Sequence, residues 1–140
     1  MQVLLDTNFV LAPMRYSFNI EHEFSRLALT DFLMIKECLL ELLNRKDMEK
    51  LFARKILIRL NPKIIEIKNK KIINKLSYHD VDPTLNWSSD YKSGYCDEAI
   101  LRVAKDYGFA VATLDKKLMS ELIKQGVRVI TLRNNTLRLL

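Results

Sequence analysis

Residues 3–8, VLLDTN, decide the fold, because an apolar run ends there abruptly on the acid Asp6. Such a run is typical of a short strand buried in a sheet. A carboxylate at the end of a buried strand is costly unless it is paired or bound to a metal. Asp97 within YCDE (95–98) and Asp115 after AVATL (110–114) stand at similar element ends. Together the three acids predict a divalent-metal site for phosphate chemistry.

Strand and helix signals alternate outward from this segment. Apolar runs predict strands over 2–6, 31–35, 63–67, 109–113 and 127–132. Helical spacing, caps and glycine stops predict helices over 20–29, 37–44, 47–60, 97–107 and 115–125, and a short helix near 72–76. The segments 13–19 and 79–94 are expected to be loops. This alternation predicts an α/β fold with a parallel sheet between helices, in which Asp6, Asp97 and Asp115 meet at the carboxyl ends of the strands.

Length and composition fit one soluble domain over residues 1–140. No apolar stretch approaches the length of a membrane span and no signal peptide is evident, so we expect a cytoplasmic protein without a membrane partner. Cys38 and Cys96 do not form a CxxC pair, and His22 and His79 lack zinc spacing. We therefore expect two reduced, buried thiols and no structural zinc.

The positive charge is concentrated in the middle of the chain. The net charge is +6, and residues 45–75 hold eleven Lys and Arg against three acids, a local +8 that leaves −2 for the rest. Such a segment suits a polyanion such as RNA. A solvated, lysine-rich helix face explains the charge equally well.

Four short motifs in order resemble those of the PIN-domain nucleases. They are LLDTN at 4–8, CLLEL at 38–42, YCDE at 95–98 and ATLDK at 112–116. The nearest resemblance is to archaeal PIN proteins related to VapC toxins and to the PIN nuclease of small-subunit rRNA processing. It implies one PIN-like α/β/α sandwich with a central parallel sheet of about five strands in the order 3-2-1-4-5. It also implies an Mg²⁺- or Mn²⁺-dependent ribonuclease, frequently a homodimer.

The resemblance also assigns roles to individual residues. It implies four catalytic acids, with Asp6, Asp97 and Asp115 on the metal and a glutamate completing the site. The usual pattern has two adjacent acids, whereas Leu42 follows Glu41 here. The second acid is therefore either Glu41 or absent, and Glu37, one turn earlier on the same face, is the reserve candidate. The implied supporting residues are Asn8 and Thr113. The basic residues that we expect to bind nucleic acid are Lys50, Arg54, Lys55 and Arg59.

Purely structural interpretations of several of these residues also stay open. Asp97 and Asp115 also suit helix N-termini, where acids complement the helix dipole or cap the first turn. Trp87, Tyr91 and Tyr95 suit either base stacking or packing of their loop onto the body of the protein. A phosphatase of the haloacid dehalogenase type is excluded, because Asn8 stands where that class needs a second acid. The remaining alternative is a catalytically degenerate PIN domain that acts as an RNA-binding or assembly module. The partner would then be RNA, with an antitoxin or a ribosome-assembly factor as a further possibility.

Overall fold

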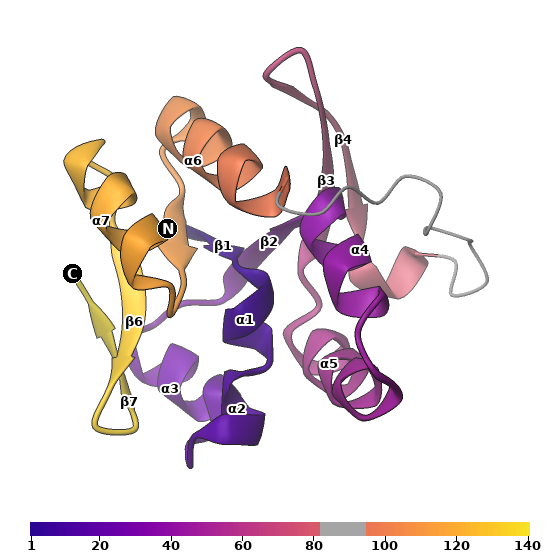
Figure 1. Ribbon diagram of the computed structural model, residues 1–140, viewed down its shortest axis with the longest axis vertical. Helices are drawn as coiled ribbons and strands as arrows, with labels where there is room; N and C mark the ends of the chain where they lie inside the picture. Colours follow the sequence, from indigo (N-terminus) through magenta and orange to yellow (C-terminus); the bar gives the residue numbers. More distant parts are fainter. Residues whose placement is uncertain (82–94) are drawn as a thin grey trace.

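The computed structural model describes residues 1–81 and 95–140, in which seven strands form one sheet flanked by helices (Figure 1). The strands are β1 (Gln2–Leu5), β2 (Asp31–Ile35), β3 (Lys63–Lys68), β4 (Lys71–Ser77), β5 (Ala110–Ala112), β6 (Val129–Arg133) and β7 (Thr136–Leu139). The helices are α1 (Thr7–Val10), α2 (Ala12–Arg15), α3 (Ile20–Arg26), α4 (Lys36–Leu43), α5 (Asp47–Leu60), α6 (Tyr95–Tyr107) and α7 (Lys116–Lys124), with a 3₁₀ turn η1 (Tyr78–Asp80).

The parallel centre of the sheet confirms the predicted strand order. The sheet runs β4-β3-β2-β1-β5-β6-β7, and the five strands from β3 to β6 are parallel neighbours. In the order of the predicted strands this is 3-2-1-4-5. The expected count of about five strands was too low, because the antiparallel strands β4 and β7 extend the two edges.

Both extra strands arise from tight turns that the hydrophobic pattern does not reveal. Asn69 and Lys70 have φ of 52° and 64°, and Asn134 and Asn135 have φ of 50° and 61°. Two successive residues with positive φ make the turn that joins twisted antiparallel strands. The short helix predicted near 72–76 is therefore wrong: Ile72, Ile73 and Leu76 belong to β4, which pairs with β3.

The segment after β1 also departs from the prediction. It forms two one-turn helices, α1 and α2, instead of a loop from Pro13, and Pro13 sits in the first turn of α2 where a missing N–H costs nothing. Phe9 and Val10 are fully buried, so the chain turns at the strand end while filling the core. The next helix, α3, begins as predicted, with the Asn19 side chain accepting from the His22 N–H at 3.0 Å.

The core lies on both faces of the parallel strands. Val3, Leu4 and Leu5 of β1 are fully buried, as a strand covered on both faces requires. Phe24 of α3 packs between Phe9 and Phe32, with ring centroids 5.8 and 4.6 Å away. Among the described residues, no helix has the length and apolar character needed to cross a membrane.

The β3–β4 turn yields a stability prediction. Lys70→Gly should raise the free energy of unfolding by about 0.5–1 kcal/mol, since a left-handed L-residue costs more than the extra chain entropy of glycine. Lys71→Gly, one residue later at the start of β4, is the matched control. This substitution should lower the free energy of unfolding, because glycine weakens a strand. Urea unfolding measures both, and equal destabilisation by the two substitutions would contradict the turn.

Candidate active site

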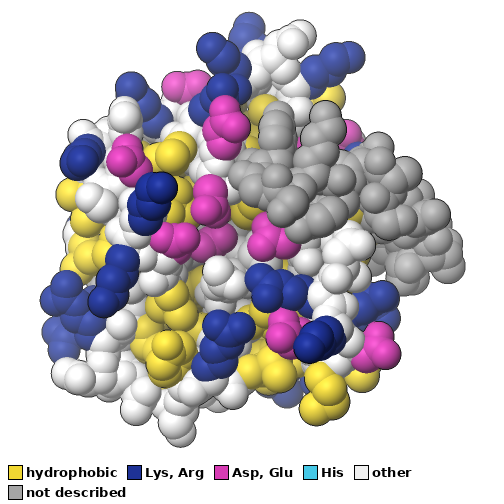
Figure 2. Space-filling view, in the orientation of Figure 1, with side chains coloured by type: hydrophobic (Ala, Val, Ile, Leu, Met, Phe, Trp, Pro, Cys, Tyr) yellow, Lys and Arg dark blue, Asp and Glu magenta, His cyan; other side chains and the backbone are white. Residues whose placement is uncertain are grey.

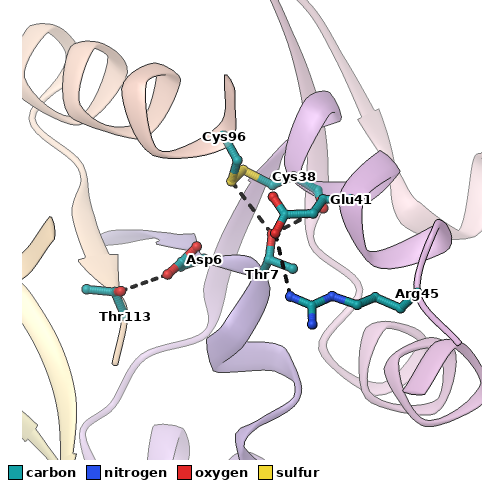
Figure 3. Close-up of a disulfide and its surroundings, with 7 residues drawn as sticks. All are labelled: Asp6, Thr7, Cys38, Glu41, Arg45, Cys96 and Thr113. Carbon is teal, nitrogen blue, oxygen red and sulfur yellow. Dashed lines mark hydrogen bonds and ion pairs between the residues drawn. A yellow bond between two sulfur atoms is a disulfide. The ribbon is translucent and has the colours of Figure 1, made fainter. Parts of the chain in front are cut away.

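Asp6 lies at the point where β1 gives way to α1. Its backbone N–H continues the sheet ladder by donating to the Ala112 carbonyl at 3.0 Å, and its own carbonyl accepts from the N–H of Phe9 at 3.1 Å. The residue is only 3% exposed. Its Oδ2 accepts a hydrogen bond from the Thr113 hydroxyl at 2.7 Å, as Figure 3 shows. The first acid is thus fixed by backbone on both sides and by one buried hydroxyl.

Burial and neighbouring acids both disfavour the charged form of Asp6. Loss of solvation raises the pKa of this carboxyl from 3.8 to about 6, against the opposing effect of the Thr113 hydrogen bond. The charges of Asp97 and Glu41 push the pKa in the same upward direction as burial. Three of the four predicted acids therefore act on one another electrostatically.

Asp97 and Asp115 enter from the two helices that flank β5. Asp97 is in the first turn of α6, and its pKa is raised by partial burial and then by the charge of Asp115. Asp115 caps α7, because its Oδ1 accepts from the backbone N–H groups of Lys117 and Leu118 at 2.9 and 3.0 Å. The capping role was one of the open interpretations, and it coexists with proximity to Asp97.

The Thr113 hydroxyl links the first and fourth acids. While donating to Asp6, it accepts from the backbone N–H of Asp115 at 3.1 Å. A threonine hydroxyl has one donor and two acceptor positions, so it serves both partners at once. The Thr113 hydroxyl therefore lies between the Asp6 carboxyl and the backbone of Asp115.

Glu41 on α4 joins the cluster with an arginine at its side. Burial raises the pKa of Glu41, Arg45 lowers it, and the charge of Asp97 raises it again. Arg45 lies 3.6 Å from Glu41 Oε1 and donates to Asn8 Oδ1 at 3.1 Å. Within residues 1–81 and 95–140, the Asn8 side chain is linked to the acids through Arg45. The sequence prediction missed Arg45, although the spacing of Glu41, Arg45 and Glu49 at intervals of four is a signal for ion pairs on a helix.

Glu37, the reserve candidate, behaves differently from Glu41. Its Oε2 is buried and has no hydrogen-bond partner among the described residues. The electrostatic effects on Asp6 come from Asp97 and Glu41 rather than from Glu37. The geometry therefore favours Glu41 as the glutamate of the cluster, and leaves Glu37 as a buried oxygen on the same helix.

The two cysteines contradict the prediction of reduced thiols, because Cys38 and Cys96 form a disulfide. They are 58 residues apart in the sequence, but α4 and α6 pack together and bring their Cα atoms to 5.0 Å. Local spacing cannot reveal such a pair, since it depends on how two distant helices meet. Both cysteines are buried, at 0% and 3% exposure.

The donor atoms at the site fit a hard divalent cation. Oxygens of Asp6 and Asp97 and the sulfur of Cys96 lie within 4.8 Å of one another. Because the disulfide removes the thiolate that soft metals prefer, the carboxylate oxygens of Asp6 and Asp97 are the donors that this group offers, and such oxygens suit Mg²⁺ or Mn²⁺. Figure 2 shows acidic side chains gathered near the middle of this face, with Lys and Arg around them.

The predicted nucleic-acid residues form two adjacent rows along α5. Lys50 and Arg54 are half-buried, and Lys55 and Arg59 are exposed. The first turn of α5 is tied to the acids, because Arg45 contacts Glu49 at 3.5 Å as well as Glu41. Arg59, at the other end, pairs with Glu21 at 3.5 Å. Trp87 and Tyr91 lie outside the described residues.

Comparisons with known proteins agree with this geometry. A family model described as a PIN like domain matches residues 84–135. Ribonuclease VapC4 of Methanocaldococcus jannaschii is 30% identical over 138 residues, which cover 94% of this chain and 90% of that protein.

Two solved structures share the fold. The PIN domain endonuclease Utp24 aligns with 99% of this chain and 90% of its own, at a TM-score of 0.72 and 18% identity. A domain of a functionally unknown protein from Methanocaldococcus jannaschii aligns with 94% of this chain and 91% of its own, at a TM-score of 0.52 and 21% identity. At these identities the likeness concerns the fold alone.

Asp6 yields a prediction for stability against pH. Without metal, the free energy of unfolding should fall as pH rises from about 4 to 6, because the folded state keeps a proton that the unfolded chain releases. A rise in pKa from 3.8 to about 6 corresponds to about 3 kcal/mol at neutral pH.

Asp6→Asn should remove most of this fall, since an amide fills the same space without titrating. Urea unfolding at pH 4.5 and 7.5 in EDTA, for the wild type and the variant, measures the difference. An identical pH dependence in the two proteins would contradict the raised pKa.

Proposed function

The chain belongs to the PIN-domain nuclease family, and from this premise we propose that it is a metal-dependent endoribonuclease that hydrolyses RNA phosphodiester bonds. The observation that carries the proposal is the convergence of Asp6, Glu41, Asp97 and Asp115 from four separate segments. The charges of Asp97 and Glu41 raise the pKa of Asp6, and the charge of Asp115 raises the pKa of Asp97. A fold gains no stability from placing acids together, so this arrangement calls for a cation.

Each acid has a distinct part in the proposed site. Asp6, Asp97 and Asp115 would hold Mg²⁺ or Mn²⁺, and Glu41 would complete the acidic set. When bound, the ion supplies positive charge against the phosphate oxygens and activates the attacking water. Thr113 fixes the orientation of Asp6 through its 2.7 Å hydrogen bond. Arg45 restrains Glu41 through their ion pair, and Asn8 in turn accepts a hydrogen bond from Arg45.

We propose α5 as the surface that binds RNA beside the acids. Its first turn is linked to the cluster through Arg45 and Glu49, and its basic rows extend from there toward Arg59. At 1.5 Å per residue, the ten residues from Glu49 to Arg59 span about 15 Å. This length accommodates several phosphates of a single strand leading away from the site.

The Arg45 contact also favours a second candidate function. An ion pair with Glu41 reduces the negative charge that this acid offers to a cation. A PIN domain with a weakened second acid would bind RNA or take part in assembly without efficient cleavage. We keep an antitoxin or a ribosome-assembly factor as the further partner that the family resemblance implies. Cytoplasmic location and a homodimer belong to the same proposal.

The site assignment predicts the effect of Asp6→Asn on cleavage. With Mn²⁺ or Mg²⁺, the variant should cut a labelled structured RNA at least about 100-fold more slowly than the wild type. The physical reason is that loss of ligand charge weakens both the metal site and the reaction. EDTA should abolish cleavage by the wild type. Glu98→Gln is the matched control, since Glu98 follows Asp97 but pairs with Arg102 at 2.8 Å. Full activity in Asp6→Asn would exclude this site, and a folded wild type that binds RNA without cutting it would favour the second candidate.

The α5 surface predicts a change in the salt dependence of RNA binding. Reversing Lys50, Arg54, Lys55 and Arg59 to Glu should weaken binding and flatten the plot of log affinity against log salt by about 0.7 for each lost phosphate contact. Reversing Lys124, in the last turn of α7, is the control. A slope that stays at the wild-type value would assign the α5 residues to a solvated face.

A further inference from the structure

The disulfide lies inside the framework that carries the proposed catalytic acids. Cys96 directly precedes Asp97 on α6, and Cys38 is three residues before Glu41 on α4, which places Cys38 and Glu41 on the same side of that helix. The bond therefore joins the two helices whose acids have to approach each other. Figure 3 shows Glu41 beside the sulfur atoms.

The segment that carries Asp6 reaches the same point. Thr7, the next residue, is 1% exposed, and its hydroxyl donates to the Cys38 carbonyl at 3.4 Å. The same Oγ1 lies 3.6 Å from Cys96 Sγ. Segments bearing Asp6, Glu41 and Asp97 thus meet at one covalent link and one buried hydroxyl.

A link at this position opposes a specific force. Carboxylates on α4, α6 and β1 repel one another whenever no cation lies between them, and the repulsion acts to separate the N-terminal turn of α6 from α4. Burial of both cysteines keeps the link in a well-packed environment, where a small displacement is resisted by neighbouring side chains. The covalent bond holds the helices where repulsion would part them.

We propose that Cys38 and Cys96 are positioning residues, whose disulfide holds Glu41 and Asp97 at the separation that metal binding and cleavage require. The proposal rests on the proposed nuclease function. A dithiol reductant opens the bond: one thiolate attacks a sulfur, the Cys38–Cys96 bond breaks, and the second thiol closes a disulfide in the reductant. Two electrons and two protons pass to the protein, leaving two thiols. Reduction should therefore loosen the acid cluster.

The experiment compares the oxidised chain, the chain reduced with dithiothreitol and the variant Cys38→Ala/Cys96→Ala. Mass spectrometry of alkylated protein verifies the thiol state. At a temperature well below each melting point, we expect kcat for RNA cleavage to fall at least tenfold in the reduced and variant forms. We expect KM for RNA to stay within twofold. Calorimetry should show weaker Mn²⁺ binding by a similar factor. Leu137→Ala, a buried truncation in β7 at the far edge of the sheet, controls for lowered stability alone.

The outcomes separate this inference from the proposed function. If folded reduced and variant proteins keep the wild-type kcat and Mn²⁺ affinity, the disulfide is only a structural link and the inference is overturned. An equal loss of activity in Leu137→Ala would overturn it as well. If no form cuts RNA but reduction weakens Mn²⁺ binding, the nuclease proposal fails while the positioning of the acids is supported.

Discussion

The buried carboxyl of Asp6 is the constraint on which the rest of the structure depends. It ends a strand that is covered on both faces, so water cannot solvate its charge. Among the described residues, the Thr113 side chain donates a hydrogen bond to this carboxyl, and further acids lie within electrostatic range. The hydrogen bond favours the charged form, whereas burial and the neighbouring acids disfavour it. A buried carboxyl among other acids is costly to the fold, so its position has to be explained together with the site.

The sequence was informative where local pattern and tertiary role coincide. The run before Asp6 is apolar because β1 is buried on both faces, and Gly108 and Gly126 mark helix ends through their positive φ. The alternation of strands and helices follows from such signals, whereas the strand order came from the resemblance to the PIN-domain family. Strands β4 and β7 were missed because their turns use Asn and Lys rather than glycine. The spacing of Arg45 from Glu41 and Glu49 was a local signal that went unused, whereas its contact with Asn8 depends on tertiary packing. The disulfide was missed because its residues meet only when α4 packs on α6.

Positive and negative charge are organised at different scales in this molecule. The acids are brought together from distant parts of the chain by β1, α4, α6 and α7, and they lie close to one another. The basic residues are concentrated within one continuous part of the sequence, from Arg45 to Lys75, and spread over α5 and the β3–β4 hairpin. In the function proposed above, the compact acidic centre would hold a small cation and the extended basic surface would bind a long anion. Arg45 is the residue at which the two distributions touch.

The β3–β4 hairpin also determines how the sheet ends. β4 is an edge strand that exposes Ile73 and Leu76, a combination that would invite another chain to add a strand. Lys71 and Lys75 are exposed on the same strand, and Lys70 stands in its turn. Exposed lysines on an edge strand disfavour the addition of a strand from another chain. The charge of this edge therefore counteracts the pairing that its apolar residues would invite.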